Sequence, residues 1–127
     1  MTNTFKYNIV TNNPSVRDKY ENTIFLEGSF KDVLLRVRDL VHTGSELVNH
    51  PLGASIRMFF SPYRSIIIKK GTGSDIEFHI NTIENSIQTY DKQMESRDPD
   101  VENSEDYSFI DEELLNSALE EFKRMSN

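Results

Sequence analysis

The hydrophobic and polar positions of the first 27 residues predict two strands with a short helix between them. The segments YNIVT (7–11) and TIFLE (23–27) are short runs rich in β-branched and aromatic side chains, which is typical of strands. Between them, Asn13 directly precedes Pro14, which is the usual order of an N-cap and a first helical residue. We therefore expect a helix over residues 14–20 that follows the first strand without a long loop.

A longer helix and a third strand are predicted in the following residues. Ser29 and Asp32 have the spacing of a capping box, and apolar residues then recur at helical spacing as far as His42. Gly44 is a plausible stop for this helix. The segment RSIIIKK (64–70) holds three consecutive isoleucines, a pattern typical of a strand that is buried on both faces.

Residues 76–90 fit two patterns. The first three apolar positions alternate as they do in a strand, whereas the apolar side chains up to Tyr90 recur at helical spacing. We favour the helix because its period is sustained for longer, and because Ser74 and Glu77 have the spacing of a second capping box.

The end of the chain differs in composition from the rest. Residues 95–108 carry six acids and a proline with little to bury, which predicts a solvated acidic linker, and residues 109–127 then predict an amphipathic helix. We therefore divide the chain into an α/β core (1–94), the linker and a C-terminal helix. This helix packs either on the core or on a partner.

The alternation of strands and helices predicts an α/β fold. We expect a small parallel three-stranded sheet with flanking helices, Rossmann-like in layout. Either the C-terminal helix covers an edge of so small a sheet or a second copy of the chain completes it as a homodimer.

Charge and composition restrict the partners and the location. The net charge of −7 belongs to residues 95–127, which hold eleven acids and three bases, whereas residues 1–94 hold eleven bases and ten acids. The body is therefore nearly neutral, and we expect no nucleic-acid partner. With no cysteine, no secretion signal and no apolar run of about 18 residues, we expect a cytoplasmic protein with no membrane partner.

The predicted parallel sheet places polar residues at one edge, because ligands gather at the carboxyl ends of parallel strands. Asn12, Asn13, Ser29, Lys69 and Lys70 follow or end the three strands and are expected to converge on one crevice. Helix N-termini and two lysines there would suit a phosphate or a carboxylate. The alternative is that Asn13 and Ser29 only cap their helices.

The connection HPLGASIRMFFSPY (50–63) is a second candidate, because loops of this length are often functional. His50 is a candidate ligand-binding residue, because an unperturbed histidine titrates near neutrality, and Arg57 and Arg64 are candidate partners for an anion. His50 before a proline also fits a simple turn residue. The apolar residues 58–60 are expected to pack in the core or in a dimer contact.

The motifs TNNP, LEGS followed by DVLLRVRD, and HPL followed by SPYRSI occur in this order over most of the chain. With them the sequence resembles the GrdX family, small proteins encoded beside the glycine, sarcosine and betaine reductases of amino-acid-fermenting anaerobic bacteria. The chain departs from the family pattern at RMFF (57–60), where a more polar connection is expected. The resemblance implies a metabolic neighbourhood and no catalytic residues.

The sequence holds no GxSxG or HExxH motif and no paired cysteines, and its three histidines are scattered. We therefore expect no catalytic residues, no metal site and no cofactor. The expected function is that of a noncatalytic accessory protein that contacts a reductase-system protein or binds a small anionic metabolite. The alternative is a small-molecule-binding enzyme or a nucleotide-binding domain with its site at the carboxyl ends of the strands.

Overall fold

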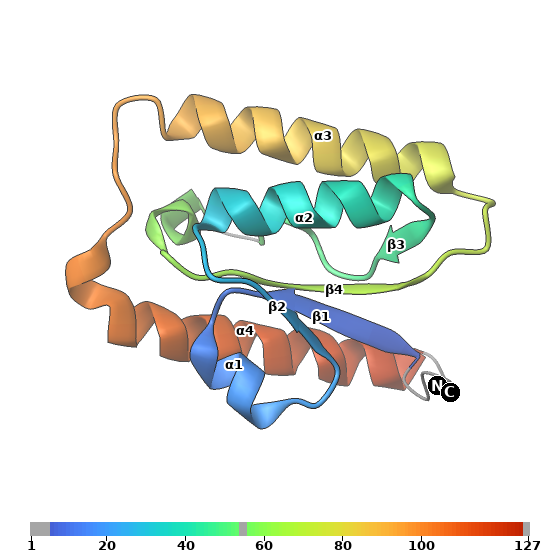
Figure 1. The fold of residues 1–127 in the computed structure, drawn as a ribbon, viewed down its shortest axis with the longest axis horizontal. Coiled ribbons are helices and arrows are strands. Elements are labelled where there is room, and N and C mark those ends of the chain that lie inside the picture. The colour runs from blue at the N-terminus through green and yellow to red at the C-terminus, as the bar shows by residue number, and fades with distance from the viewer. Residues whose placement is uncertain (1–5, 54–55, 126–127) are drawn as a thin grey trace.

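The computed structural model describes residues 6–53 and 56–125, which form an α/β fold around one four-stranded sheet (Figure 1). The sheet order is β2-β1-β4-β3. In chain order the elements are β1 (Tyr7–Thr11), α1 (Pro14–Lys19), β2 (Thr23–Phe25), α2 (Phe30–His42), β3 (Ser45–Leu47), a 3-10 helix (Ile56–Phe60), β4 (Ser65–Lys70), α3 (Ile76–Gln93), a 3-10 turn (Val101–Asn103) and α4 (Ser104–Met125).

The sheet is mixed, so the prediction of a parallel three-stranded sheet is wrong in both strand number and direction. Strands β1 and β2 are parallel, as expected, but β4 runs antiparallel to β1, with Thr11 opposite Ser65 and Tyr7 opposite Lys69. The cause is β3, which the sequence analysis missed. Because β3 runs antiparallel to β4 and so in the same direction as β1, the long loop that follows it ends beside the carboxyl end of β1, and β4 returns in the opposite direction.

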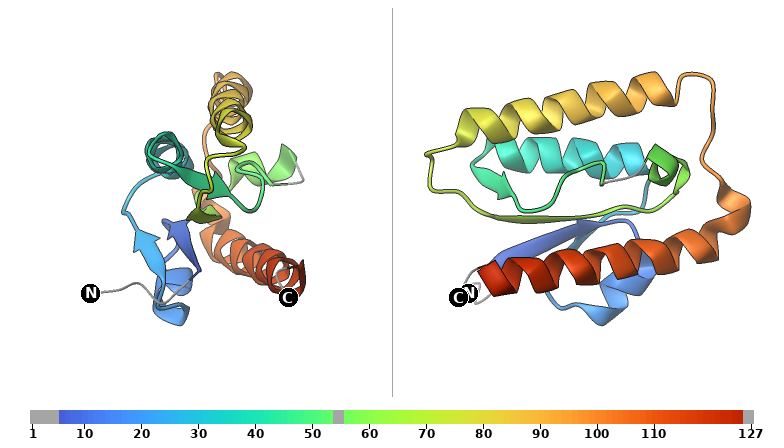
Figure 2. Two further views of the ribbon diagram at one scale, coloured as in Figure 1. Left: turned by 90° about the vertical axis from the view of Figure 1, so that its right-hand side faces the viewer. Right: turned by 180° about the vertical axis from the view of Figure 1, so that it is seen from behind.

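Helices cover both faces of the sheet (Figure 2). Helices α2 and α3 lie on one face, where their apolar side chains pack with Val10, Ile66 and Ile68. Helices α1 and α4 lie on the other face and pack against Ile9 and Ile67. The consecutive isoleucines of β4 thus point alternately into two cores, which confirms the prediction that this strand is buried on both faces.

Several local signals in the sequence form as expected. The Asn13 side chain accepts a hydrogen bond from the Ser15 amide and caps α1, and Ser29 and Asp32 make both hydrogen bonds of a capping box at α2. Gly44 follows α2 with a φ of 117°, a conformation that favours glycine. Gly71 donates to the Gly44 carbonyl at 2.9 Å and must be a glycine, because a Cβ there would lie 2.1 Å from that oxygen.

Residues 76–93 form the helix that the longer apolar period predicted. The predicted capping box at its start is wrong. Asp75 is the N-cap residue and makes no side-chain capping bond, because the Ser74 hydroxyl pairs instead with the hydroxyl of Thr72 at 2.9 Å.

The long connection folds over the core rather than away from it. Its middle forms the 3-10 helix, and Met58 and Phe59 are buried there, which confirms the expectation that these residues pack. The Phe59 ring lies 6.0 Å from that of Tyr90 on α3, and the Phe60 ring receives the Arg97 guanidinium at 5.3 Å. The side chain of Arg57 lies outside the described part of the chain.

Helix α4 packs on its own sheet. It begins at Ser104, so the last five residues of the predicted linker are helical, and Leu115 and Leu119 are buried against β1 and β4. Its contacts with α1 include a Lys19–Glu112 ion pair and a hydrogen bond from Tyr20 to Asn116. Within the described ranges, no helix has the length and apolar character that crossing a membrane requires.

We expect Leu115→Ala to lower the free energy of unfolding by about 2–5 kcal/mol, because it leaves a cavity between α4 and the sheet. Leu114→Ala is the matched control, since the neighbouring leucine is 40% exposed whereas Leu115 is 1% exposed, and should cost about 0.5 kcal/mol or less. Urea denaturation measures both values. Equal small losses would contradict the packing of α4 on the sheet.

Candidate functional site

The seven residues predicted to bind a ligand lie at two ends of the sheet. Asn12, Asn13 and Arg64 gather at the carboxyl end of β1, where Ser29 also lies, just after Gly28. Lys69 and Lys70 lie at the opposite end, because β4 is antiparallel and Lys69 pairs with the first residue of β1. The lysines therefore do not join the asparagines in one crevice.

Asn12 holds three parts of the chain together through its buried side chain. Its amide nitrogen donates to the carbonyls of Gly28 and Pro62, both at 2.8 Å, and its amide oxygen accepts from the Arg64 backbone amide at 2.9 Å. The side chain thus uses both hydrogens and its oxygen to join the ends of β1 and β2 to the start of β4.

Asn13 belongs to a buried network that ties α4 to the sheet, which we call the Asp111 network (Thr11, Asn13, Ser65 and Asp111). The Asp111 carboxylate, 1% exposed, accepts from the Ser65 backbone amide at 2.9 Å, from the Ser65 hydroxyl at 2.7 Å and from the Asn13 side chain at 3.0 Å. The Thr11 hydroxyl bonds to that of Ser65 at 2.8 Å and accepts from the Asn13 amide at 3.0 Å. One carboxylate thereby joins α4 to β1 and β4.

Burial raises the pKa of the Asp111 carboxyl above its ordinary value of 3.8, because the low dielectric around it disfavours the charged form. The hydrogen bonds from Ser65 and Asn13 and the nearby positive charge of Arg64 act in the opposite direction. The hydrogen bonds thus stabilise the charged carboxylate and offset part of the cost of removing it from water.

Arg64 fixes the start of the long loop. Its buried guanidinium donates from Nε to the Pro51 carbonyl at 2.8 Å and from Nη2 to the His50 carbonyl at 2.6 Å. Burial lowers the pKa of Arg64, and the Asp111 charge acts to raise it. The two buried charges compensate each other across the start of β4, so Arg64 serves the fold and faces no open surface.

His50 and Ser29 both have local structural roles. The His50 Nδ1 atom accepts from the Leu52 backbone amide at 3.1 Å, which makes it a turn residue, and burial followed by the Arg64 charge lowers its pKa. Ser29 is exposed, and its hydroxyl is used in the α2 capping box. Capping therefore accounts for the hydroxyl of Ser29 as well as for the side-chain oxygen of Asn13.

The lysine end of the sheet is more open. Lys70 is exposed, and the Lys69 ammonium lies 3.8 Å from a carboxylate oxygen of Glu46. The other Glu46 oxygen accepts from the Thr72 amide at 2.9 Å, and this hydrogen bond is the main reason that the pKa of Glu46 is lowered.

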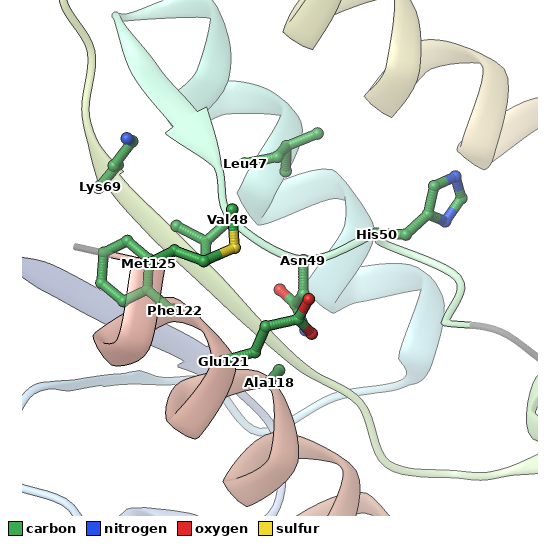
Figure 3. A pocket seen from close by; sticks show the side chains of 9 residues that line it. All are labelled: Leu47, Val48, Asn49, His50, Lys69, Ala118, Glu121, Phe122 and Met125. Carbon is green, nitrogen blue, oxygen red and sulfur yellow. The ribbon is translucent and has the colours of Figure 1, made fainter. Parts of the chain in front are cut away.

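A cleft of about 510 Å³ opens between the segment 47–50 and the last two turns of α4 (Figure 3). We call it the α4 cleft. Helix α4 lies over β1 and β4 but not over the edge strand β3, so part of this face of the sheet is left uncovered. The cleft is lined by Leu47, Val48, Asn49, His50, Lys69, Ala118, Glu121, Phe122 and Met125.

Asp111 and the α4 side of the cleft were not predicted from the sequence. Asp111 lies near the start of the predicted C-terminal helix (109–127) and was given no binding role, whereas α4 begins seven residues earlier and the carboxylate points into the protein. One signal was available, since Ala118, Phe122 and Met125 are spaced to share one face of a helix. Nothing in the sequence showed which strand that face would meet.

Comparisons with known proteins agree with the resemblance drawn from the motifs. The family model described as GrdX-like protein matches residues 8–120, which confirms that resemblance over β1 to α4. No curated protein and no solved structure matched the chain.

We expect the stability of the protein relative to an Asp111→Asn variant to fall as the pH rises. The pKa of Asp111 in the folded protein lies above its value in the unfolded chain. The contribution of Asp111 to the free energy of unfolding is therefore complete below a pH of about 3.8 and is lost as the pH rises through the folded-state pKa. The difference in the free energy of unfolding between wild type and Asp111→Asn changes by at most about 1.4 kcal/mol per pH unit. Urea denaturation across this range measures it, with Asp106→Asn on the exposed side of α4 as the control. A wild type that gains stability relative to Asp111→Asn with rising pH would contradict the assignment.

Proposed function

The chain belongs to the GrdX-like protein family, and on this premise we propose that it is a noncatalytic accessory protein of glycine reductase-type amino-acid fermentation. It acts by contact with a protein of the reductase system. The metabolic context comes from the family resemblance, and the mode of action comes from how the polar residues and the exposed apolar residues are distributed.

One observation carries the proposal. The polar side chains at the carboxyl ends of β1 and β2 that were expected to hold a ligand are engaged with other parts of the same chain. Asn12 uses its whole side chain, Arg64 binds two loop carbonyls and Asn13 joins the Asp111 network. A nucleotide-binding or catalytic site there, which is the alternative function, would have to replace hydrogen bonds that hold the fold together.

The outer surface of α4 offers a contact for a protein partner. Phe109 is 64% exposed, and Val101, Ile110 and Leu114 add exposed apolar surface before and along the same helix. Exposed acids, including Glu105 and Glu113, accompany them. We infer that the partner presents an apolar patch with basic residues around it, because such a surface complements both features of α4.

A second mode, binding of a small anionic metabolite, is favoured by one observation. A hollow of about 310 Å³ lies at the lysine end of the sheet, and its lining includes Lys69, Lys70, Thr43 and Ser45. Two ammonium groups and the Ser45 hydroxyl suit a carboxylate or a phosphate, whereas the Thr43 hydroxyl donates to the Leu40 carbonyl at 2.9 Å. This hollow is far from the asparagines at the other end of the sheet.

Affinity purification of the tagged protein from cells that ferment amino acids with these reductases tests the proposed contact. We expect wild type and Phe78→Ser to recover reductase components, and Phe109→Ser to lose them. Phe78 is the matched control because it is equally exposed, at 66%, but lies on α3. Circular dichroism checks that both variants are folded.

If wild type recovers no reductase component under several mild conditions, the proposed function is contradicted. If Phe109→Ser recovers them as well as wild type does, the contact lies elsewhere than on the outer surface of α4.

A further inference from the structure

The α4 cleft is an amphipathic site at the edge of the sheet. Its volume of about 510 Å³ lies within the range of roughly 300–1,000 Å³ that is usual for small-molecule sites. One wall is the extended segment after β3, where the Val48 amide donates to the Ile67 carbonyl at 2.9 Å and the Asn49 side chain binds the same residue at 2.7 Å. The other wall is formed by the last two turns of α4. Backbone and side-chain hydrogen bonds to Ile67 thus fix the first wall, and the helix supplies the second.

The middle of the cleft is apolar. Val48 belongs to the wall after β3, and Phe122 and Met125 face it from successive turns of α4 (Figure 3). The Phe122 ring is held by an edge contact with the Tyr7 ring at 5.6 Å, whereas Met125 at the rim is 78% exposed. A flexible thioether over a fixed aromatic ring suits an apolar side chain of variable shape.

Opposite charges flank this apolar middle. In Figure 3, Lys69 and Glu121 lie on opposite sides of Val48 and Met125, and the His50 ring points away from them. The Lys69 side chain is 42% exposed, and its 3.8 Å contact with Glu46 is a long surface ion pair of the kind that contributes little. Lys69 is thus available to a ligand carboxylate, and the exposed Glu121 to a ligand ammonium.

We propose that the α4 cleft binds short peptides that have free termini. The carboxylate of the peptide pairs with Lys69, its ammonium pairs with Glu121, and an apolar side chain lies against Val48, Phe122 and Met125. A simple anion fits less well, because Glu121 repels it and the apolar middle stays uncovered. This inference goes beyond the proposed accessory function and does not depend on any contact with a reductase.

The test uses the purified full-length protein and the tripeptide alanyl-leucyl-alanine in four forms: free, N-acetylated, C-amidated and blocked at both ends. Isothermal titration is expected to show saturable binding of the free form and about two- to fivefold weaker binding for each single block, the size expected for the loss of one solvent-exposed ion pair. Lys69→Gln should remove the difference between free and amidated peptide. Glu121→Gln should remove the difference between free and acetylated peptide.

Matched controls lie next to each charged residue. Lys70→Gln and Glu120→Gln make the same charge changes at exposed positions outside the cleft lining and should keep both differences. If the doubly blocked peptide binds as tightly as the free peptide, the cleft is an apolar site only. If the acetylated peptide binds as tightly as the free peptide, the cleft is an anion site only. Either result overturns the proposal, as does the absence of saturable binding.

A second copy of the chain in the cleft would also overturn the proposal. Sedimentation would then show a dimer that Met125→Ser disrupts, and peptide binding would be absent. None of these outcomes bears on the recovery of reductase components, so the two proposals can fail separately.

Discussion

The buried carboxylate of Asp111 is the interaction on which the rest of the structure depends. It joins the last helix of the chain to the first and fourth strands through Ser65 and Asn13. Without a partner on α4, the Ser65 amide and the Asn13 side chain would be buried polar groups lacking that acceptor, at a cost of about 1–3 kcal/mol each. The carboxylate also compensates the buried charge of Arg64, which in turn positions the long loop. Sheet, loop and α4 are thus connected through one residue.

This use of polar groups decides where function can reside. The carboxyl ends of β1 and β2 are the usual place for a ligand in an α/β sheet, but here they are closed by hydrogen bonds within the chain. The open features lie on α4 and at the β3 edge, where the helix does not reach across the sheet. The polar groups at the carboxyl ends of β1 and β2 are hydrogen-bonded within the chain, whereas α4 exposes apolar and acidic residues.

Local signals in the sequence predicted the elements well, because caps and periodicity depend on neighbouring residues. Asn13, the capping box at Ser29 and the isoleucines of β4 are examples. Topology depends on pairings between distant residues, and one short strand changed it. The segment Ser45–Leu47 is too short to show a period of two, yet as an edge strand that runs in the direction of β1 it leaves β4 antiparallel to β1 and separates the lysines from the asparagines. Asp111 was missed for the same reason, since its partners lie 46 and 98 residues away.

The central claim is that α4 and the sheet form one cooperative unit held by Asp111. Native-state hydrogen exchange tests it most directly, because it reports the free energy of opening at each amide. The account predicts that the amides of Leu115 and Leu119 exchange with the same opening free energy as those of Ile9 and Ile67. If the amides of α4 exchange at a much lower free energy while the sheet stays protected, the helix opens on its own and the claim is contradicted.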